Sequence, residues 1–283
     1  MAGPTGGERP PAGWYGDPWG AAALRWWDGE AWTSGVSATG HDAPPPPTAV
    51  EGPPSFDRRA LPVAIAAYVA AGVGAVVVGV GAAAVTDSDV VVIVAAQTAL
   101  YGSLLTACRR TTRAYGTGSW RSDLGLRFRA QDIVTGIGTF IVASAIANAV
   151  ASLVASDPDL QGSATDSLFD VSASTSVLVV VALIAVVGAP FVEEVFFRGL
   201  LLRSLASQLG PLGANLAQAV LFALAHIDPA QGWHNVDTVV RVFVLGLAFG
   251  YIAQERRRLG PGIAAHAVTN IVAVVVNLLL PLG

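Results

Sequence analysis

The feature that most constrains the fold of this chain is the recurrence of long apolar runs after residue 58. Each run approaches the roughly 20 residues that a helix needs to cross the hydrocarbon core of a membrane. Of the 283 residues, 53% are hydrophobic and only 13% are charged, whereas about a quarter of the residues of a soluble domain are charged. The sequence therefore predicts an all-α, polytopic membrane helical bundle of about seven spans, at 61–85, 89–108, 133–155, 175–207, 211–228, 237–254 and 261–282.

The placement of arginine orients this predicted bundle. Arginines lie before the first span, between the second and third, after the glutamates of the fourth and before the seventh, whereas the alternate loops hold aspartates. Because arginine concentrates in cytoplasmic loops, we expect a multi-pass protein of a bacterial plasma membrane, in contact with membrane lipid, with a cytoplasmic N-terminus. The net charge of −4 indicates no nucleic-acid partner.

The polar N-terminal region contains a segment rich in tryptophan. Five of the seven tryptophans of the chain lie within residues 11–36, and Asp28-Gly29 between aromatic residues is a signal for a hairpin turn. We expect a small β-hairpin module with stacked tryptophans, which either docks a peptide or envelope component or is a passive appendage. The predicted parts of the chain are 1–10, disordered; 11–36, the Trp-rich module; 37–57, a Pro-rich linker; and 58–283, the transmembrane domain.

Two adjacent carboxylates and an arginine interrupt the fourth predicted span. A charged group in hydrocarbon costs roughly 2.5–3.5 kcal/mol even on lenient insertion scales, so each of these groups needs a partner or a task. On a helix, Glu194 and Arg198 share a face because they are four residues apart, and Glu193 is turned about 100° away. We therefore expect Arg198 to neutralise Glu194 and to leave Glu193 as the working carboxylate.

Two later spans contribute imidazole and amide groups. His226 lies in the fifth predicted span, and His266 and Asn270 lie four residues apart in the seventh, facing the same way. In a shared cavity, Glu193 and His226 could hold and deprotonate a water molecule. His266 and Asn270 could then donate hydrogen bonds to the oxygen of a tetrahedral intermediate. This set suits amide hydrolysis, with Phe222 as a cavity wall or a packing residue.

Other hydrolytic designs fit the sequence less well. There is no HExxH motif, because Ile227 follows His226, and there is no G-x-S-x-G motif. The single cysteine, Cys108, has no nearby histidine in the sequence. We expect no cofactor, and a zinc ion held by two histidines and a glutamate stays open as an alternative.

The ordered polar set resembles the intramembrane glutamate peptidase family that includes the CAAX-prenyl endopeptidases and the Abi-type proteins. That family carries Glu-Glu-x-x-x-Arg, Phe-x-x-x-His and His-x-x-x-Asn motifs on successive membrane helices. The resemblance covers about residues 130–282, and the Trp-rich module resembles a short domain of unknown function that precedes membrane segments in actinobacterial proteins. The resemblance to the glutamate peptidases implies catalytic roles for Glu193, His226, His266 and Asn270. It also implies structural or electrostatic support from Glu194, Arg198 and Phe222.

Three functions are consistent with these features. The first is an intramembrane endopeptidase that hydrolyses a peptide bond in a membrane-associated peptide or protein. The second is a non-catalytic membrane adaptor or immunity-type scaffold of the same fold, and the third is a transporter with the buried glutamate as a proton relay. The complete set of motifs favours the first, and the hydrophobic segments carry no convincing inverted repeat that would favour the third. The natural substrate stays open.

Overall fold

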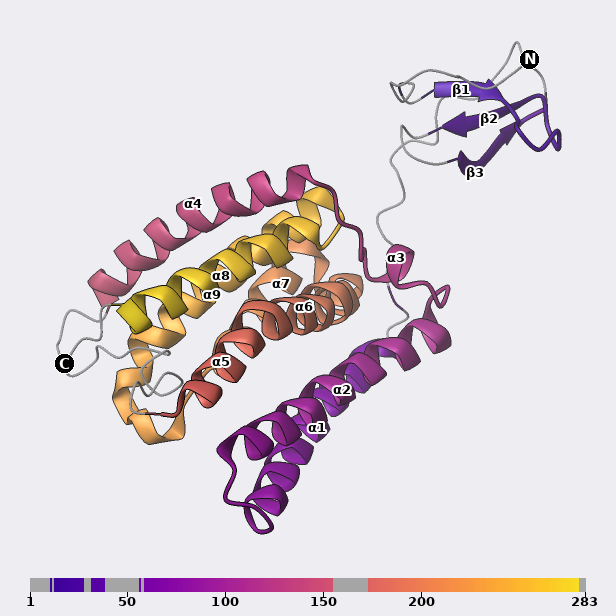
Figure 1. The fold of residues 1–283 in the computed structure, drawn as a ribbon. Coiled ribbons are helices and arrows are strands. Elements are labelled where there is room, and N and C mark those ends of the chain that lie inside the picture. Colours follow the sequence, from indigo (N-terminus) through magenta and orange to yellow (C-terminus); the bar gives the residue numbers. More distant parts are fainter. Residues whose placement is uncertain are drawn as a thin grey trace. The chain divides into compact units, whose positions relative to one another are not determined.

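The computed structural model describes residues 11, 13–27, 32–38, 56, 59–154 and 173–279. The chain divides into two compact units, 1–52 and 53–283, and Figure 1 draws both. The predicted Asp28-Gly29 turn, the predicted disordered segment and most of the predicted linker lie outside the described residues.

The first unit contains a three-stranded antiparallel sheet in the order β1-β2-β3. The pairing of β2 with β3 is the hairpin that the sequence predicts, and β1 adds a third strand that the sequence did not predict. A third strand is expected on physical grounds, because an isolated two-stranded hairpin is marginally stable in water. The strands are β1 (Gly13–Gly16), β2 (Leu24–Trp27) and β3 (Trp32–Ser37).

The tryptophans of this sheet meet edge to face. The ring centroids of Trp14 and Trp26 are 5.4 Å apart at an interplanar angle of 69°, and those of Trp27 and Trp32 are 5.3 Å apart at 65°. The prediction of stacked rings was therefore wrong in its geometry. The edge of an aromatic ring is positive and its face negative, so the perpendicular arrangement is favourable.

An ion pair ties the β1–β2 connection to the sheet. The Nε of Arg25 donates to Oδ1 of Asp17 at 2.8 Å, and the backbone N–H groups of Trp19 and Ala22 donate to the same carboxylate. The hydrogen bond from Arg25, aided by these backbone donors, holds the pKa of Asp17 below its usual value. The carboxylate therefore stabilises the module only when it is ionised.

We expect acidification to loosen this module. Because the pKa of Asp17 is lowered on folding, its contribution is present above the unfolded value of about 3.9 and is lost as the pH falls through the folded value. Tryptophan fluorescence of the full chain should therefore stay constant from pH 7 to about 5 and change below about 4. Asp17→Asn should remove this acid transition, and an identical transition in the variant would show that another group causes it.

The second unit is helical. Among its described residues, six helices are long and apolar enough to cross a membrane, which confirms a multi-pass helical bundle. The described helices are α1 (Ala60–Ala83), α2 (Asp89–Tyr115), α3 (Trp120–Asp123), α4 (Gln131–Val154), α5 (Thr175–Leu183), η2 (Ile184–Gly188), α6 (Ala189–Glu193), η3 (Glu194–Leu201), α7 (Leu202–Leu224), η4 (Pro229–His234), α8 (Asn235–Arg256) and α9 (Gly260–Leu279).

The difference from the predicted seven spans arises in one stretch. The fourth predicted span, 175–207, and most of the fifth, 211–228, lie in Thr175–Leu224, a 50-residue run of helix that is broken at Gly210 (φ 69°, ψ 175°). Phe197 before this break and Phe222 after it have ring centroids 5.0 Å apart, whereas a straight helix would separate them by roughly 37 Å. The chain therefore reverses at Gly210, and the two predicted spans are two legs of one helical stretch.

Two turns of the first leg are π-helical. They are η2 and η3, which lie on either side of α6. A π turn closes i→i+5 hydrogen bonds, so it carries an extra residue and shifts the faces of the residues that follow. The sequence predicted a kink near Gly188–Pro190, and in the structure the π-helical segment η2 ends at Gly188, two residues before Pro190.

The legs of this stretch are packed among the other long helices. Helices α4, α8 and α9 contact one another, α7 packs along α8, and α9 contacts η2 and α6. Figure 1 shows α1 and α2 side by side as a separate pair, and this pair contacts η3. The functional groups of α6, η3, α7 and α9 are thereby brought to the interior of one bundle.

Candidate active site

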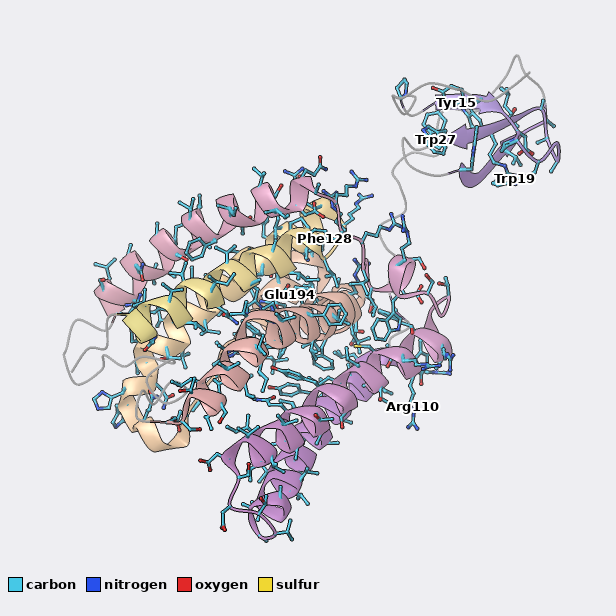
Figure 2. All side chains as sticks on the ribbon, viewed as in Figure 1. Tyr15, Trp19, Trp27, Arg110, Phe128 and Glu194 are labelled. Atoms are coloured by element: carbon cyan, nitrogen blue, oxygen red, sulfur yellow. The ribbon has the colours of Figure 1, made fainter. Side chains whose placement is uncertain are left out.

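The two glutamates lie at the junction of α6 and η3. Glu194 is fully buried, and Nη1 of the fully buried Arg198 lies 3.0 Å from its Oε1. Figure 2 shows Glu194 within the bundle. The predicted pairing of Arg198 with Glu194 is therefore confirmed.

The guanidinium of Arg198 is surrounded by ring faces and one carbonyl. Its Cζ lies 4.1 Å from the ring centroid of Phe222 and 5.5 Å from that of Phe249. Its Nη2 donates to the carbonyl oxygen of Gly246 at 3.4 Å. A cation over an aromatic face is stabilised by the ring quadrupole, more strongly where water is excluded. These neighbours help to keep the charge of Arg198 in an apolar bundle.

His266 of α9 lies between the two carboxylates. Its Nδ1 is 3.2 Å from Oε1 of Glu194, and its Nε2 is 3.9 Å from Oε2 of Glu193. A carboxylate oxygen can only accept, so Nδ1 carries the hydrogen in the contact with an ionised Glu194. The imidazole ring stacks on the ring of Phe249, with the two centroids 5.5 Å apart and an interplanar angle of 29°. Nε2 of His266 is therefore the nitrogen that faces Glu193.

Glu193 differs from its neighbour in its contacts. Its side chain is 19% exposed, compared with 0% for Glu194, and its Oε2 is buried without a hydrogen-bond partner among the described residues. A buried oxygen without a donor is costly, so such a group in a native structure calls for an explanation. It is a carboxylate that is available to bind and move a proton.

His226 lies just after the end of α7. Its Nδ1 is 2.7 Å from the carbonyl oxygen of Phe222, and its ring centroid is 4.7 Å from that of Phe222. Because a carbonyl only accepts, Nδ1 is the donor, and Nε2 of the neutral ring is an acceptor. Within the part of the chain that the structure describes, His226 forms no hydrogen bond or ion pair with Glu193. The ring of Phe222 lies between it and His266, 5.9 Å from the latter.

Asn270 makes a bond that follows from the sequence around Pro190. In the π turn η2, the N–H of Ala189 donates to the carbonyl of Ile184, five residues earlier. The next such bond would run from residue 190 to Ala185, but proline has no N–H. The Nδ2 of Asn270 donates to this carbonyl of Ala185 at 2.6 Å. Asn270 thus supplies the hydrogen bond that Pro190 cannot make.

Because Asn270 supplies the donor that Pro190 lacks, mutations of these two residues should have coupled effects on the free energy of unfolding. Asn270→Ala should lower the free energy of unfolding by about 1–3 kcal/mol, because it leaves a carbonyl without a donor. In a Pro190→Ala background the cost should shrink, since the new backbone N–H at this position can donate to the carbonyl of Ala185. Thermal unfolding of the four proteins of this cycle measures the coupling.

A matched control exists on the same helix. The amide of Asn277 donates to Ala273, a carbonyl of its own helix α9, so Asn277→Ala should cost the same in both backgrounds. Equal costs for Asn270→Ala in both backgrounds would contradict the proposed exchange of donors.

Several residues of this site carried no signal in the sequence. Phe249 is one apolar residue among many, and its contact with His266 depends on how α8 and α9 pack. At Gly262, a Cβ would lie 2.8 Å from Oε2 of Glu194, so glycine permits the close approach of α9. Gly262 lies four residues before His266 on the same helix, and this spacing could have indicated that it faces the site. Tyr68 of α1 and Tyr101 of α2 are partly buried against the hydrophobic core that includes Val192 and Val195, on either side of the glutamates.

Glu193, Glu194 and His266 lie close together, but their arrangement is not that of a metal site. Among the described residues, no group of three or more His, Cys, Asp and Glu side chains is arranged to hold a metal ion.

Known protein families match two separate parts of the chain. The helical bundle with a carboxylate, imidazole and guanidinium cluster at its centre is a multi-pass membrane protein. Residues 175–272 match the family model described as type II CAAX prenyl endopeptidase Rce1-like, and residues 12–50 match that of DUF2510, a protein of unknown function. No curated protein and no solved structure gives a significant match.

The family match confirms the resemblance seen in the sequence. It spans a narrower segment than the 130–282 expected, and all seven of the predicted site residues lie inside it. The match supports an intramembrane peptidase at the level of the family for the segment 175–272. The second match extends past the predicted end of the Trp-rich module at residue 36.

Proposed function

We propose that this protein is an intramembrane endopeptidase that hydrolyses a peptide bond in a membrane-associated peptide or protein, with Glu193 as the general base. The observation that carries the proposal is the state of Glu193. Its buried Oε2 has no hydrogen-bond partner among the described residues and faces Nε2 of His266. The adjacent carboxylate, Glu194, is already neutralised by Arg198.

In this mechanism Glu193 takes a proton from a water molecule. The water oxygen forms a bond to the carbonyl carbon of the substrate, and the electron pair of the C=O bond moves to the oxygen. The proton is then delivered to the peptide nitrogen as the C–N bond breaks. Positioned proton transfer of this kind contributes roughly a hundredfold to ten-thousandfold to a rate.

His266 is suited to stabilise the oxyanion when it is protonated. With its Nδ1 hydrogen directed at Glu194, only the imidazolium form has a second hydrogen on Nε2. The positive charges of Arg198 and His266 then balance the two carboxylates. A donor aimed at a developing oxyanion in a dry site is commonly worth a hundredfold or more in rate, roughly 10²–10³ per donor.

His226 and Asn270 remain the other proposed members of the site. Nε2 of His226 is left as an acceptor by the bond of Nδ1 to Phe222, which suits it to orient the water. The amide of Asn270 has two hydrogens, and its bond to Ala185 uses one. The second hydrogen can be donated to an oxyanion.

The direct test is hydrolysis by the purified protein in liposomes. Membrane-spanning reporter peptides of varied sequence would be offered, and cleavage would be followed by mass spectrometry. We expect cleavage by the wild type that Glu193→Ala lacks. Equal turnover by the variant would remove Glu193 from the mechanism, and the absence of cleavage across the whole set would favour a non-catalytic scaffold.

A metal-independent mechanism makes a separate prediction. Incubation with a zinc chelator, followed by its removal, should leave the rate of cleavage unchanged, because Glu193 activates the water without a Lewis acid. Turnover is measured before chelation, after it, and after added zinc. A loss that zinc restores would support the zinc alternative.

For the Trp-rich module we propose a docking role toward a peptide or an envelope component. The side chain of Trp19 is 65% exposed, with the guanidinium of Arg25 4.7 Å from its ring centroid. Exposed aromatic residues beside arginine are typical of binding surfaces. A pulldown with the full chain should recover a specific partner that Trp19→Ala loses. One such partner without any hydrolysis would favour the adaptor.

We also propose a location in the bacterial plasma membrane with the N-terminus in the cytoplasm. The proposal rests on the distribution of arginine among the loops. Reporter fusions at the two ends of the chain test it.

A further inference from the structure

Two amide side chains, Asn215 and Gln218, form a cluster that shares a backbone acceptor with Arg198. Neither residue belongs to the sequence motifs. The side chain of Gln218 on α7 is fully buried, and its Nε2 is 2.9 Å both from the carbonyl oxygen of Gly246 and from Oδ1 of Asn215. Nδ2 of Asn215 donates in turn to the carbonyl of Leu247 at 3.1 Å. Two amide side chains of α7 are thus bonded to the backbone of α8.

Two glycines of α8 make room for these amides. A Cβ at Gly250 would overlap the amide of Asn215, and one at Gly246 would come within 3.3 Å of Ala219. Small residues spaced by four let helices approach until their backbones are within reach of polar side chains. The close packing of α7 on α8 therefore exposes the carbonyl of Gly246 to Gln218.

The same carbonyl oxygen also serves Arg198. Gly246 accepts from Gln218 at 2.9 Å and from Nη2 of Arg198 at 3.4 Å. A carbonyl oxygen has two lone pairs, and inside an α-helix such as α8 it also accepts the N–H of the residue four positions later. Gln218 and Arg198 therefore compete for the remaining acceptor capacity, and the shorter bond belongs to Gln218. The guanidinium is held on its other side by Glu194, whose Oε1 is 3.0 Å away.

We propose that Gln218 is a positioning residue for this site, acting on the reaction through Arg198. By holding the carbonyl of Gly246, it limits how far the guanidinium can move away from Glu194. Glu194 is the acceptor for Nδ1 of His266, so the orientation of the imidazole that faces Glu193 depends on this chain of contacts. The inference rests on the proposed peptidase function and assigns to Gln218 no contact with substrate.

The test uses an isosteric replacement without donors. In Gln218→Met, the carbonyl of Gly246 loses its nearer donor, and Arg198 can shift toward it and loosen its hold on Glu194. We expect kcat to fall about tenfold with KM unchanged, because a positioning residue acts on the transition state and not on binding.

A matched control is available on the same pair of helices. Nε2 of Gln254 on α8 donates to the carbonyl of Pro211 at 2.9 Å, away from the glutamates. Gln254→Met removes the same kind of bond between α7 and α8, and it should leave kcat and KM at the wild-type values. An equal fall in kcat in both variants would indicate general helix packing and would overturn the proposal.

A second readout does not depend on turnover. The full chain has four histidines, so ring ¹⁵N resonances of the histidine-labelled protein in detergent can be assigned with a His266→Gln variant. The Nδ1 resonance of His266 should shift in Gln218→Met and stay in place in Gln254→Met. If the wild type cleaves nothing, the peptidase proposal fails, while this resonance still decides whether Gln218 positions the ring.

A further variant covers a failure of Gln218→Met to fold. Gln218→Glu keeps the shape of the side chain and offers at most one donor in place of two. It should therefore shift the His266 resonance in the same direction as Gln218→Met, but by a smaller amount. Wild-type kcat and an unmoved His266 resonance in whichever variant folds would overturn the proposal.

Discussion

Replacing Glu193 by glutamine should abolish cleavage while leaving the protein at least as stable as the wild type. Removal of a general base costs roughly a hundredfold to ten-thousandfold in rate, which brings turnover close to background. The substitution keeps the size of the side chain. It also removes a carboxylate whose buried Oε2 has no hydrogen-bond donor among the described residues. Cleavage rate and melting temperature are both measured on the liposome-embedded protein.

The combination of lost activity and retained stability distinguishes a working carboxylate from a structural one. Glu255, an exposed glutamate in the last turn of α8, is the matched control, and Glu255→Gln should leave both quantities unchanged. If Glu193→Gln instead cleaves at the wild-type rate, another group activates the water. If it unfolds, Glu193 stabilises the packing of the bundle.

Replacing Arg198 by methionine should have the largest effect on stability of any single change in the bundle. It leaves Glu194 fully buried without its cation, and breaking a buried ion pair from one side costs roughly 3–5 kcal/mol. The measurement is thermal unfolding of the detergent-solubilised protein. Arg110→Met is the control, because Arg110 is an exposed arginine of α2, and it should change the melting temperature little.

The double variant Glu194→Gln/Arg198→Met tests the cause. Removing both charges together leaves no uncompensated group, so much of the lost stability should return. Cleavage should stay below the wild-type rate, because Nδ1 of His266 then faces a neutral amide in place of a carboxylate. A double variant as unstable as Arg198→Met alone would show that the arginine stabilises the fold mainly through its contacts with Phe222, Phe249 and Gly246.

These two replacements separate the roles of adjacent glutamates. Glu193 and Glu194 follow each other in the sequence, yet one side chain is a fifth exposed and the other is fully buried. Loss of activity without loss of stability is expected at the first, and loss of stability is expected when the cation beside the second is removed. A single buried ion-pair network with no catalytic member would make both variants unstable.

Much of the site could be predicted from the sequence because its rules are local. The four-residue spacing of Glu194 and Arg198 is a property of one helix, and the pairing holds although the turn between them is π-helical. The improbability of charge within an apolar run is likewise independent of packing. Hydrophobic run length alone predicted the multi-pass bundle, and the break at Gly210 falls in the gap that it left between the predicted spans 175–207 and 211–228.

Other features depended on which helices meet, and no local rule carries that information. The sequence proposed that Glu193 and His226 hold a water molecule, and it did not predict that His266 lies against both glutamates or that His226 bonds to its own helix at Phe222. Asn270 was expected at the oxyanion, and its amide is seen to serve the carbonyl that Pro190 leaves without a donor.

The division between the two sources of information has a physical reason. Burying charge in an apolar bundle is costly wherever it occurs, so the residue types and their spacing alone determined that this chain forms membrane helices whose carboxylate and imidazole groups need a partner or a task. The partner of each polar group is set by distances of about 3 Å between helices far apart in the chain. Those distances depend on glycines such as Gly246 and Gly262, whose effect is visible only once the helices are packed, and therefore only the tertiary structure decided them.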